Sequence, residues 1–210
     1  MFSLLLALAC SAPAEKSDPE ATVDTAPPGD SADAQDSADG TPLPTLTLRG
    51  PDLLPSEGSA LADRCDWVLP AVHACEGPSP ALAWEGLPDE AVELLLMLDD
   101  PDAGDWPHWA VLHLPVDAAG LDAGVSQSGQ TSTLPAGAVE LENGAGYTGY
   151  FGSCPPTAHV YRWRLWALPT AAVDPGRGGA KANFRELAAA ADATALSTAT
   201  LCHIYDPDAP

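Results

Sequence analysis

The chain is 210 residues long, which is enough for one domain of ordinary size and a tail, and its formal net charge is −22 at pH 7. It contains eight Lys and Arg residues against 30 Asp and Glu residues. So few cations cannot form a basic surface that attracts a nucleic acid or an anionic bilayer, so the composition excludes nucleic acid as a partner.

The N-terminal segment MFSLLLALAC is apolar, too short to span a bilayer, and typical of the hydrophobic part of a secretory signal peptide. It ends like a lipobox, although no Lys or Arg precedes it and Ala7 and Leu8 stand in the less usual order. We predict that residues 1–10 are a lipoprotein signal peptide and that Cys10 is lipidated. The protein would then be exported and anchored to the bacterial cell envelope, at the outer membrane or the periplasmic face. The alternative is a frayed apolar N-terminus.

Residues 11–44 are predicted to be a disordered acidic linker, because their aliphatic content is too small to offset the entropy of ordering them. Between Cys10 and Gly40, eight acidic residues stand against one base, Lys16, which gives a local charge of −7. Such a self-repelling segment would hold a domain away from the membrane. A calcium-binding acidic repeat is the alternative, but the segment lacks the glycine spacing of such repeats.

The domain is expected to occupy residues 45–205. It begins with the alternating segment TLTLRG at residues 45–50, and a short strand is expected at ALAW, residues 81–84. Residues 117–137 are rich in Gly, Ser, Gln and Thr and are predicted to form a long, mobile surface loop. A further strand is expected at AVEL, residues 138–141.

Two apolar runs within residues 94–115 flank a polar segment that carries Asp99, Asp100, Asp102 and His108. Each run is too short for a globular helix and too apolar for a loop, so both are predicted to be buried strands. Asp-Pro and the following Ala-Gly end the first strand, which leaves its carboxylates at a strand end, facing any cavity that the sheet encloses.

The alternation of side chains along a strand groups His108 with Ala110, Leu112 and Leu114. It puts His113 on the opposite face, where a packed or hydrogen-bonded role is expected.

In the predicted strand at residues 161–168, Tyr161 shares a face with His159, while Arg162 and Arg164 point to the other face. Residues 180–199 are alanine-rich, with apolar residues at helical spacing, and predict a helix or two that pack one face on the sheets. The final residues 206–210 repeat DPDAP with no strand after them and are interpreted as a tail.

Four sequence pieces resemble the phosphatidylethanolamine-binding proteins, in the bacterial branch called Raf kinase inhibitor-like. They are SPALAW at residues 79–84, DPDA at 100–103, HW at 108–109 and the run G-Y-x-G-x-x-P-P-x-x-H-x-Y at 149–161. They occur in the family's order, and the resemblance covers roughly residues 51–205. It implies a mainly β fold, a sandwich of two antiparallel sheets with a C-terminal helix.

The resemblance also implies a small anion pocket, with no cofactor, no metal and no catalysis. Its polar groups would come from Asp100, His108, His159 and Tyr161, with a rim at Pro155 and Pro156 and backbone N–H groups from Gly152, Ser153 and Cys154. We expect both imidazoles to charge as the pH falls through about 6.5 and to strengthen the binding of a phosphoryl or carboxylate group. The sequence departs from the family's pattern at Gly104, Ser153 and Val160, where proline, proline and arginine are common.

Four cysteines remain after Cys10, and an exported chain allows them to form disulfides. Three pairings of Cys65, Cys75, Cys154 and Cys202 are possible, and the sequence does not decide among them. If neighbours in the sequence pair, a bond from Cys65 to Cys75 would close a short loop, and a bond from Cys154 to Cys202 would connect the expected pocket loop to the C-terminus. Zinc is the competing use, but no C-x-x-C pair is present.

Other functions remain open. Family members also act as protein-interaction modules and inhibitors, for example of peptidases. His108, His159 and Asp100 form the ligand set of a facial metal site, which could serve a hydrolase. Ser153 with a histidine and Asp100 could form a hydrolase triad, although the segment lacks the G-x-S-x-G form. Alternatively, the polar residues are only a structural network that caps a sandwich core.

Overall fold

A computed structural model of the chain describes residues 45–172, 174–175 and 178–209. The expected signal peptide, Cys10 and the acidic linker lie outside these residues. Within the described residues, no helix is long and apolar enough to cross a membrane.

The larger of two sheets has seven strands in the order β2-β3-β10-β9-β5-β6-β8. Its strands are β2 (Leu54–Pro55), β3 (Trp67–Val68), β5 (Glu93–Asp100), β6 (Trp106–Leu114), β8 (Val139–Glu140), β9 (His159–Leu168) and β10 (Ser197–Tyr205). All neighbours pair antiparallel except β3 and β10, which are parallel. Every residue of β5 is buried, because both faces of this central strand are covered, and this explains why the apolar run does not alternate.

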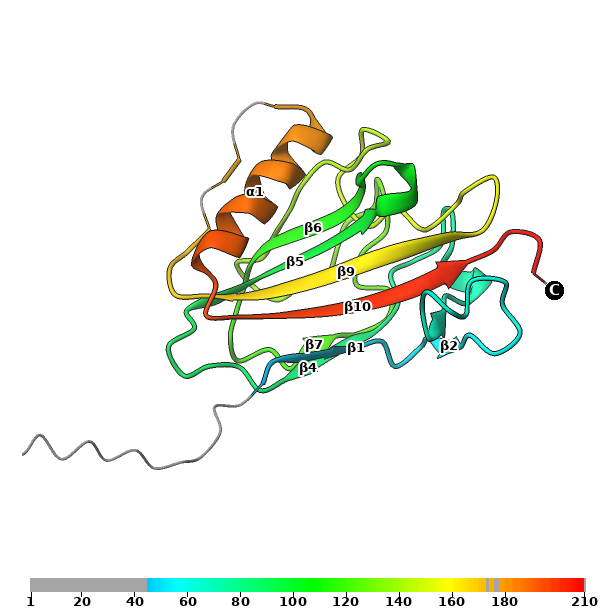
Figure 1. Ribbon diagram of the computed structural model, residues 1–210. Helices are drawn as coiled ribbons and strands as arrows, with labels where there is room; N and C mark the ends of the chain where they lie inside the picture. The colour runs from blue at the N-terminus through cyan, green and yellow to red at the C-terminus, as the bar shows by residue number, and fades with distance from the viewer. Residues whose placement is uncertain (1–44, 173, 176–177, 210) are drawn as a thin grey trace, which may run out of the picture. The chain divides into compact units, whose positions relative to one another are not determined.

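The smaller sheet has three strands, β1 (Thr47–Arg49), β4 (Leu82–Glu85) and β7 (Gly120–Leu121), in the order β1-β4-β7. It lies on one side of the large sheet, and helix α1 (Ala180–Thr194) lies on the other (Figure 1). Two 3₁₀ turns, η1 (Ala71–His73) and η2 (Pro101–Ala103), complete the fold. The predicted mainly β architecture of two sheets and a helix is confirmed.

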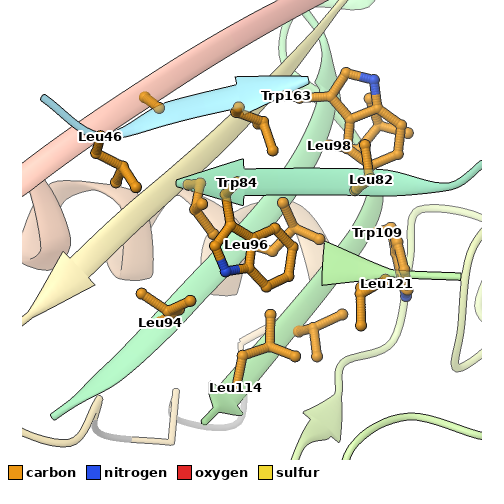
Figure 2. Close-up of a cluster of buried hydrophobic side chains, with 14 of the residues drawn as sticks. Leu46, Leu82, Trp84, Leu94, Leu96, Leu98, Trp109, Leu114, Leu121 and Trp163 are labelled. Carbon is orange, nitrogen blue, oxygen red and sulfur yellow. The ribbon is translucent and has the colours of Figure 1, made fainter. Parts of the chain in front are cut away.

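Two apolar layers hold the three parts together. Between the sheets, Leu96, Leu98 and Trp163 of the large sheet pack with Leu82 and Trp84 of the small one (Figure 2). On the other side of the large sheet, α1 contributes buried side chains at the i, i+3, i+4 and i+7 positions, namely Phe184, Leu187, Ala188 and Ala191. The large sheet therefore positions side chains on both faces, and each face can carry its own polar site where the apolar cover ends.

The sequence predictions for the C-terminal part were wrong in one respect. The helix ends at Thr194, and residues 197–205, of which the first three were assigned to the helix, form strand β10. β10 pairs with β9 along its whole length, from Ser197 opposite Ala167 to Tyr205 opposite His159. Its helix-side residues Thr198 and Thr200 are β-branched, which favours a strand over the alanine-rich helix before it.

The segment 117–137 is also more ordered than predicted. It contains strand β7, and Leu121, Val125 and Ser126 are buried in the domain. The oxygen of Ser79 accepts a hydrogen bond from the Gly124 amide, so this segment is fixed to the chain before β4. It is therefore a packed connection that carries an edge strand.

A β-bulge in β6 overturns the face expected for His108. Asp99 pairs with Pro107 and Leu98 with Trp109, so His108 is the extra residue between them. Its ring therefore lies on the side of Tyr161, with ring centroids 5.1 Å apart, while Ala110 packs under α1. A second irregularity includes His113, whose φ is 56°, and its Nδ1 lies 2.9 Å from Glu93 Oε2, which confirms the hydrogen-bonded role expected for it.

The two disulfides join Cys65 to Cys202 and Cys75 to Cys154. The neighbour pairings that we considered are therefore not formed. β3 lies beside β10, which brings Cys65 to the C-terminal strand, and Cys75 bonds through its backbone to Gly152 and Ser153, which brings it to the loop before β9. Each bridge thus follows a backbone pairing between distant parts of the chain.

Peptide mapping without reduction tests this pairing. We expect linked peptides that contain Cys65 with Cys202 and Cys75 with Cys154. The double variant Cys65→Ser, Cys202→Ser should lose about 2–5 kcal/mol of unfolding free energy, because the bridge closes a long loop of 137 residues in the unfolded chain. A peptide that links Cys65 to Cys75 would contradict the structure.

Candidate functional site

A pocket of about 200 Å³ opens where the end of β5 meets the beginnings of β6 and β9. Antiparallel pairing brings these strand ends to the same edge of the large sheet. The pocket is lined by Asp100, Ala103, Trp106, His108, Phe151, Cys154, Pro155, Pro156, His159 and Tyr161. Seven of the nine residues expected to bind a ligand are therefore together in one cavity.

Asp100 is the last residue of β5, and both of its carboxylate oxygens accept hydrogen bonds at the pocket. Oδ1 accepts a hydrogen bond from the Ala103 amide at 3.1 Å and so caps η2. Oδ2 accepts one from His159 Nδ1 at 2.7 Å. Gly104 ends this turn in the left-handed region, with φ of 67°. The proline usual in the family could not adopt this angle, so the glycine is part of the observed turn.

His108 is held with one ring nitrogen engaged. Its Nδ1 lies 2.7 Å from the carbonyl oxygen of Phe151, and because a carbonyl oxygen only accepts, Nδ1 carries the proton. The other nitrogen, Nε2, makes no hydrogen bond to the described residues. Burial lowers the pKa of His108 to about 4, against the opposing effect of the Phe151 carbonyl. The expectation that this imidazole charges near pH 6.5 was wrong, and His108 presents a hydrogen-bond acceptor at neutral pH.

Tyr161 forms the inner wall between the two histidines. It is 1% exposed, and its ring is 5.1 Å from the His108 ring and 6.3 Å from the His159 ring, between centroids. Burial raises the pKa of its phenol, and the nearby Asp100 carboxylate raises it further. The hydroxyl therefore keeps its proton and is a hydrogen-bond donor.

Aromatic side chains that sequence reasoning missed complete the pocket. The Trp106 ring packs edge-on to His108 at 4.4 Å and is 5.5 Å from the Phe151 ring. Both residues adjoin recognised motifs, since Trp106 precedes the HW pair and Phe151 lies inside the glycine-rich run. Among the lining residues, Asp100 is the only carboxylate, and none is Lys or Arg.

Gly152 and Ser153 do not line the pocket as expected. The Gly152 amide donates to the Cys75 oxygen at 3.0 Å, so it is already used. A side chain at position 152 would meet the His73 oxygen and Cys75 nitrogen at 2.6 and 2.7 Å, which explains the glycine. Ser153 is fully buried, and its Oγ lies 2.8 Å from Nε2 of His203. Cys154 alone of the three reaches the cavity.

His203 was missed by sequence reasoning and lies behind the pocket. Trp163 Nε1 donates to His203 Nδ1 at 2.8 Å, which leaves the ring proton on Nε2 and makes that nitrogen the donor to Ser153 Oγ. The ring stacks on Tyr161 with centroids 4.9 Å apart. Complete burial lowers the pKa of His203 to about 3. A neutral, fully hydrogen-bonded chain of side chains therefore supports the inner wall.

Asp102 orders the same edge from outside. Its Oδ1 accepts from Arg64 Nη2 at 2.7 Å, and its Oδ2 accepts from the Val160 amide at 3.0 Å. The Arg64 guanidinium holds the pKa of this carboxyl below its ordinary value. Within the described residues, no group of three or more His, Cys, Asp or Glu side chains is arranged to hold a metal ion.

The fold and the pocket together define a β-sandwich protein with a small, polar, aromatic-walled cavity at one end of its large sheet. The sequence profile described as phosphatidylethanolamine-binding protein matches residues 64–206, and the chain belongs to this family.

Three relatives illustrate the similarity. The UPF0098 protein of Methanothermobacter thermautotrophicus is 39% identical over 142 residues, which are 65% of this chain and 89% of the relative. A Mycobacterium tuberculosis protein named "Putative lipoprotein LppC" is 40% identical over 122 residues, which are 54% of this chain and 56% of the mycobacterial protein. The crystal structure of Escherichia coli YbcL superimposes with a TM-score of 0.60 at 26% identity, covering 77% of this chain and 98% of YbcL.

The buried histidines predict loss of stability in acid. Because the folded-state pKa of His108 is about 4 and the unfolded value is about 6.5, the unfolded chain takes up the proton first. The stabilisation is complete above pH 6.5 and is lost as the pH falls toward 4. We expect His108→Gln to reduce the difference in unfolding free energy between pH 7 and pH 4.5 by about 2 kcal/mol, measured by urea unfolding. An unchanged difference in this variant would show that His108 is not buried in its neutral form.

Proposed function

We propose that the protein binds a small oxyanion group in this pocket without chemical turnover, and that the group is a phosphoryl or carboxylate group. The observation that carries the proposal is the convergence of a protonated phenol at Tyr161 and a neutral imidazole acceptor at His108 on one cavity. The family's description as phosphatidylethanolamine-binding supports a phosphoryl group as the ligand.

The charge of the residues that line the pocket limits the charge of the ligand that can bind. A dianion would meet the Asp100 carboxylate with no Lys or Arg in the cavity to neutralise it. A singly charged oxyanion that keeps one acid proton avoids most of this repulsion. It can donate that proton to His108 Nε2 while it accepts from the Tyr161 hydroxyl. For a phosphoryl ligand, we therefore propose that the pocket selects the protonated, monoanionic form.

The arrangement of Ser153 supports binding rather than serine hydrolysis. A hydrolase base must accept the serine proton, whereas His203 Nε2 donates to Ser153 Oγ because its Nδ1 already accepts from Trp163. Ser153 is also fully buried, out of reach of a substrate. A metal-dependent hydrolase built on His108, His159 and Asp100 has weaker support, since among the described residues these side chains are not arranged as a group that could hold a metal ion.

We also propose that the domain at residues 45–205 is exported and held at the cell envelope by lipid on Cys10, with residues 11–44 as the linker. The similarity to LppC, a relative named as a lipoprotein, supports this proposal together with the lipobox-like N-terminus. The second candidate function for an anchored anion-binding domain is that of an interaction module, for example an inhibitor of a peptidase. The exposed rim at Cys154 and Pro156 favours that second function, in which a partner would insert a phosphorylated side chain or a C-terminal carboxylate.

Methyl phosphate and methyl sulfate test the proposal as a matched pair. The two have similar shapes, but below pH 6 methyl phosphate is largely a monoanion with one acid proton, whereas methyl sulfate is a monoanion with none. By calorimetry at pH 5.5 we expect methyl phosphate to bind at least about tenfold more tightly, the value of one hydrogen bond to a charged group. Its affinity should fall as the pH rises through about 6, because the ligand then loses its proton.

The variant His108→Ala should lose the preference for methyl phosphate and most of the affinity. His113→Gln, a histidine on the other face of β6, is the control and should bind like the unmodified protein. Equal binding of the two esters, or affinity that increases above pH 7, would reject selection of the protonated form. No binding of either ester would reject the anion pocket itself.

A further inference from the structure

Half of the eight Lys and Arg residues of this acidic chain gather around one groove. The groove has a volume of about 230 Å³ and lies between α1 and the helix-facing side of β9. Arg162 and Arg164 of β9 form its floor, and Lys181 and Arg185, one turn apart on α1, form its wall. It is separate from the pocket described above, because Arg162 and Tyr161 point to opposite faces of the sheet.

The floor is rigid and its guanidinium groups are fixed. Asp99, whose side chain is 3% exposed, accepts from Arg162 Nε and Nη2 at 2.9 and 2.8 Å and from Arg164 Nη2 at 2.6 Å. The Arg164 guanidinium also lies over the Trp166 ring, 4.8 Å from its centroid. One buried carboxylate therefore orients two cations whose repulsion would otherwise separate them.

These contacts leave donors unused. The two guanidiniums carry ten N–H bonds, and within the described residues they make four hydrogen bonds, three to Asp99 and one to Asp105. The Arg164 Nε is buried without a partner among those residues. Six of the ten N–H bonds are therefore unused on two side chains that line the groove, and they can donate to a further acceptor.

The wall adds positive charge that the protein does not neutralise. Lys181 and Arg185 form no ion pair with the described residues, and the Lys181 ammonium extends toward the Gly104 turn. Of the three groove carboxylates, Asp99 and Asp105 bind Arg162, and Asp192 accepts from Trp166 Nε1 at 2.7 Å. Four cations against three carboxylates leave the groove positive in a chain whose net charge is −22.

We propose that this groove, lined by Arg162, Arg164, Lys181 and Arg185, is a second anion site that takes a small, multiply charged oxyanion. Its chemistry is opposite to that of the first pocket. The first offers a neutral acceptor beside a carboxylate and fits a protonated monoanion. The groove offers four cationic side chains against three carboxylates that already accept hydrogen bonds within the protein, and it fits a fully ionised group such as sulfate. The site does not depend on the function proposed for the first pocket.

NMR with inorganic sulfate tests the proposal on the full folded chain. Sulfate carries no proton at neutral pH, so binding in the groove is separable from binding in the first pocket. We expect the Nε–H signals of Arg162 and Arg164 and the backbone amide signals of residues 181–185 to shift along a saturating curve. The amide signals of Phe151 and Cys154, at the first pocket, should stay unchanged.

Two variants and a matched control complete the test. Lys181→Met and Arg185→Met are exposed substitutions on the helix, and each should weaken sulfate binding by about fivefold, the value of one partly exposed ion pair. Arg49→Met removes an equally charged side chain on the small sheet, where Arg49 pairs with Glu85, and should leave binding unchanged. Shifts that rise linearly without saturating, or an equal effect of all three variants, would overturn the proposal and leave a structural ion-pair network.

Discussion

The antiparallel register of β5 and β9 is the constraint on which both polar sites depend. Asp99 lies opposite Arg162, and because successive side chains alternate, Asp100 and Tyr161 turn to the other face. Both strands are held in the middle of the seven-stranded sheet by apolar layers on either side. If β5 shifted by one residue against β9, each of its side chains would move to the opposite face of the sheet. Buried carboxylates would then lie against the apolar layers, and the free energy cost of burying them there fixes the register.

The same two strands therefore produce opposite electrostatics on the two faces of the sheet. On the pocket side, desolvation keeps His108 and His203 neutral and Tyr161 protonated, so the polar groups act through hydrogen bonds rather than charge. On the helix side, Arg162 and Arg164 share one carboxylate and retain unused donors. This difference in charge follows from the alternation of side chains along β5 and β9. One set of side chains faces apolar surroundings, and the other faces the groove beside α1.

Local pattern in the sequence was sufficient for β1, β4, β5, β6, β8 and β9 and for the split of β9 into two faces. The family resemblance supplied the grouping of Asp100, His108, His159 and Tyr161. It was insufficient wherever an outcome depended on a partner strand. The bulge at His108 exists only in register with β5, and the pairing of Cys65 with Cys202 needs β3 beside β10. His203 was hidden because the preceding alanine-rich stretch resembles a continuing helix. The pKa of His108 could not be inferred from its position in a motif, since Phe151 and Tyr161, which pack against its ring, come from separate segments of the chain.

The protonation state of His108 is the central claim about the pocket, and nitrogen NMR of the imidazole measures it directly. With ¹⁵N-labelled histidine at pH 5.5, we predict a neutral ring with the proton on Nδ1 and a bare Nε2 whose resonance moves upfield when methyl phosphate is added, as an accepted hydrogen bond requires. A doubly protonated ring at that pH, or a proton on Nε2, would contradict the account.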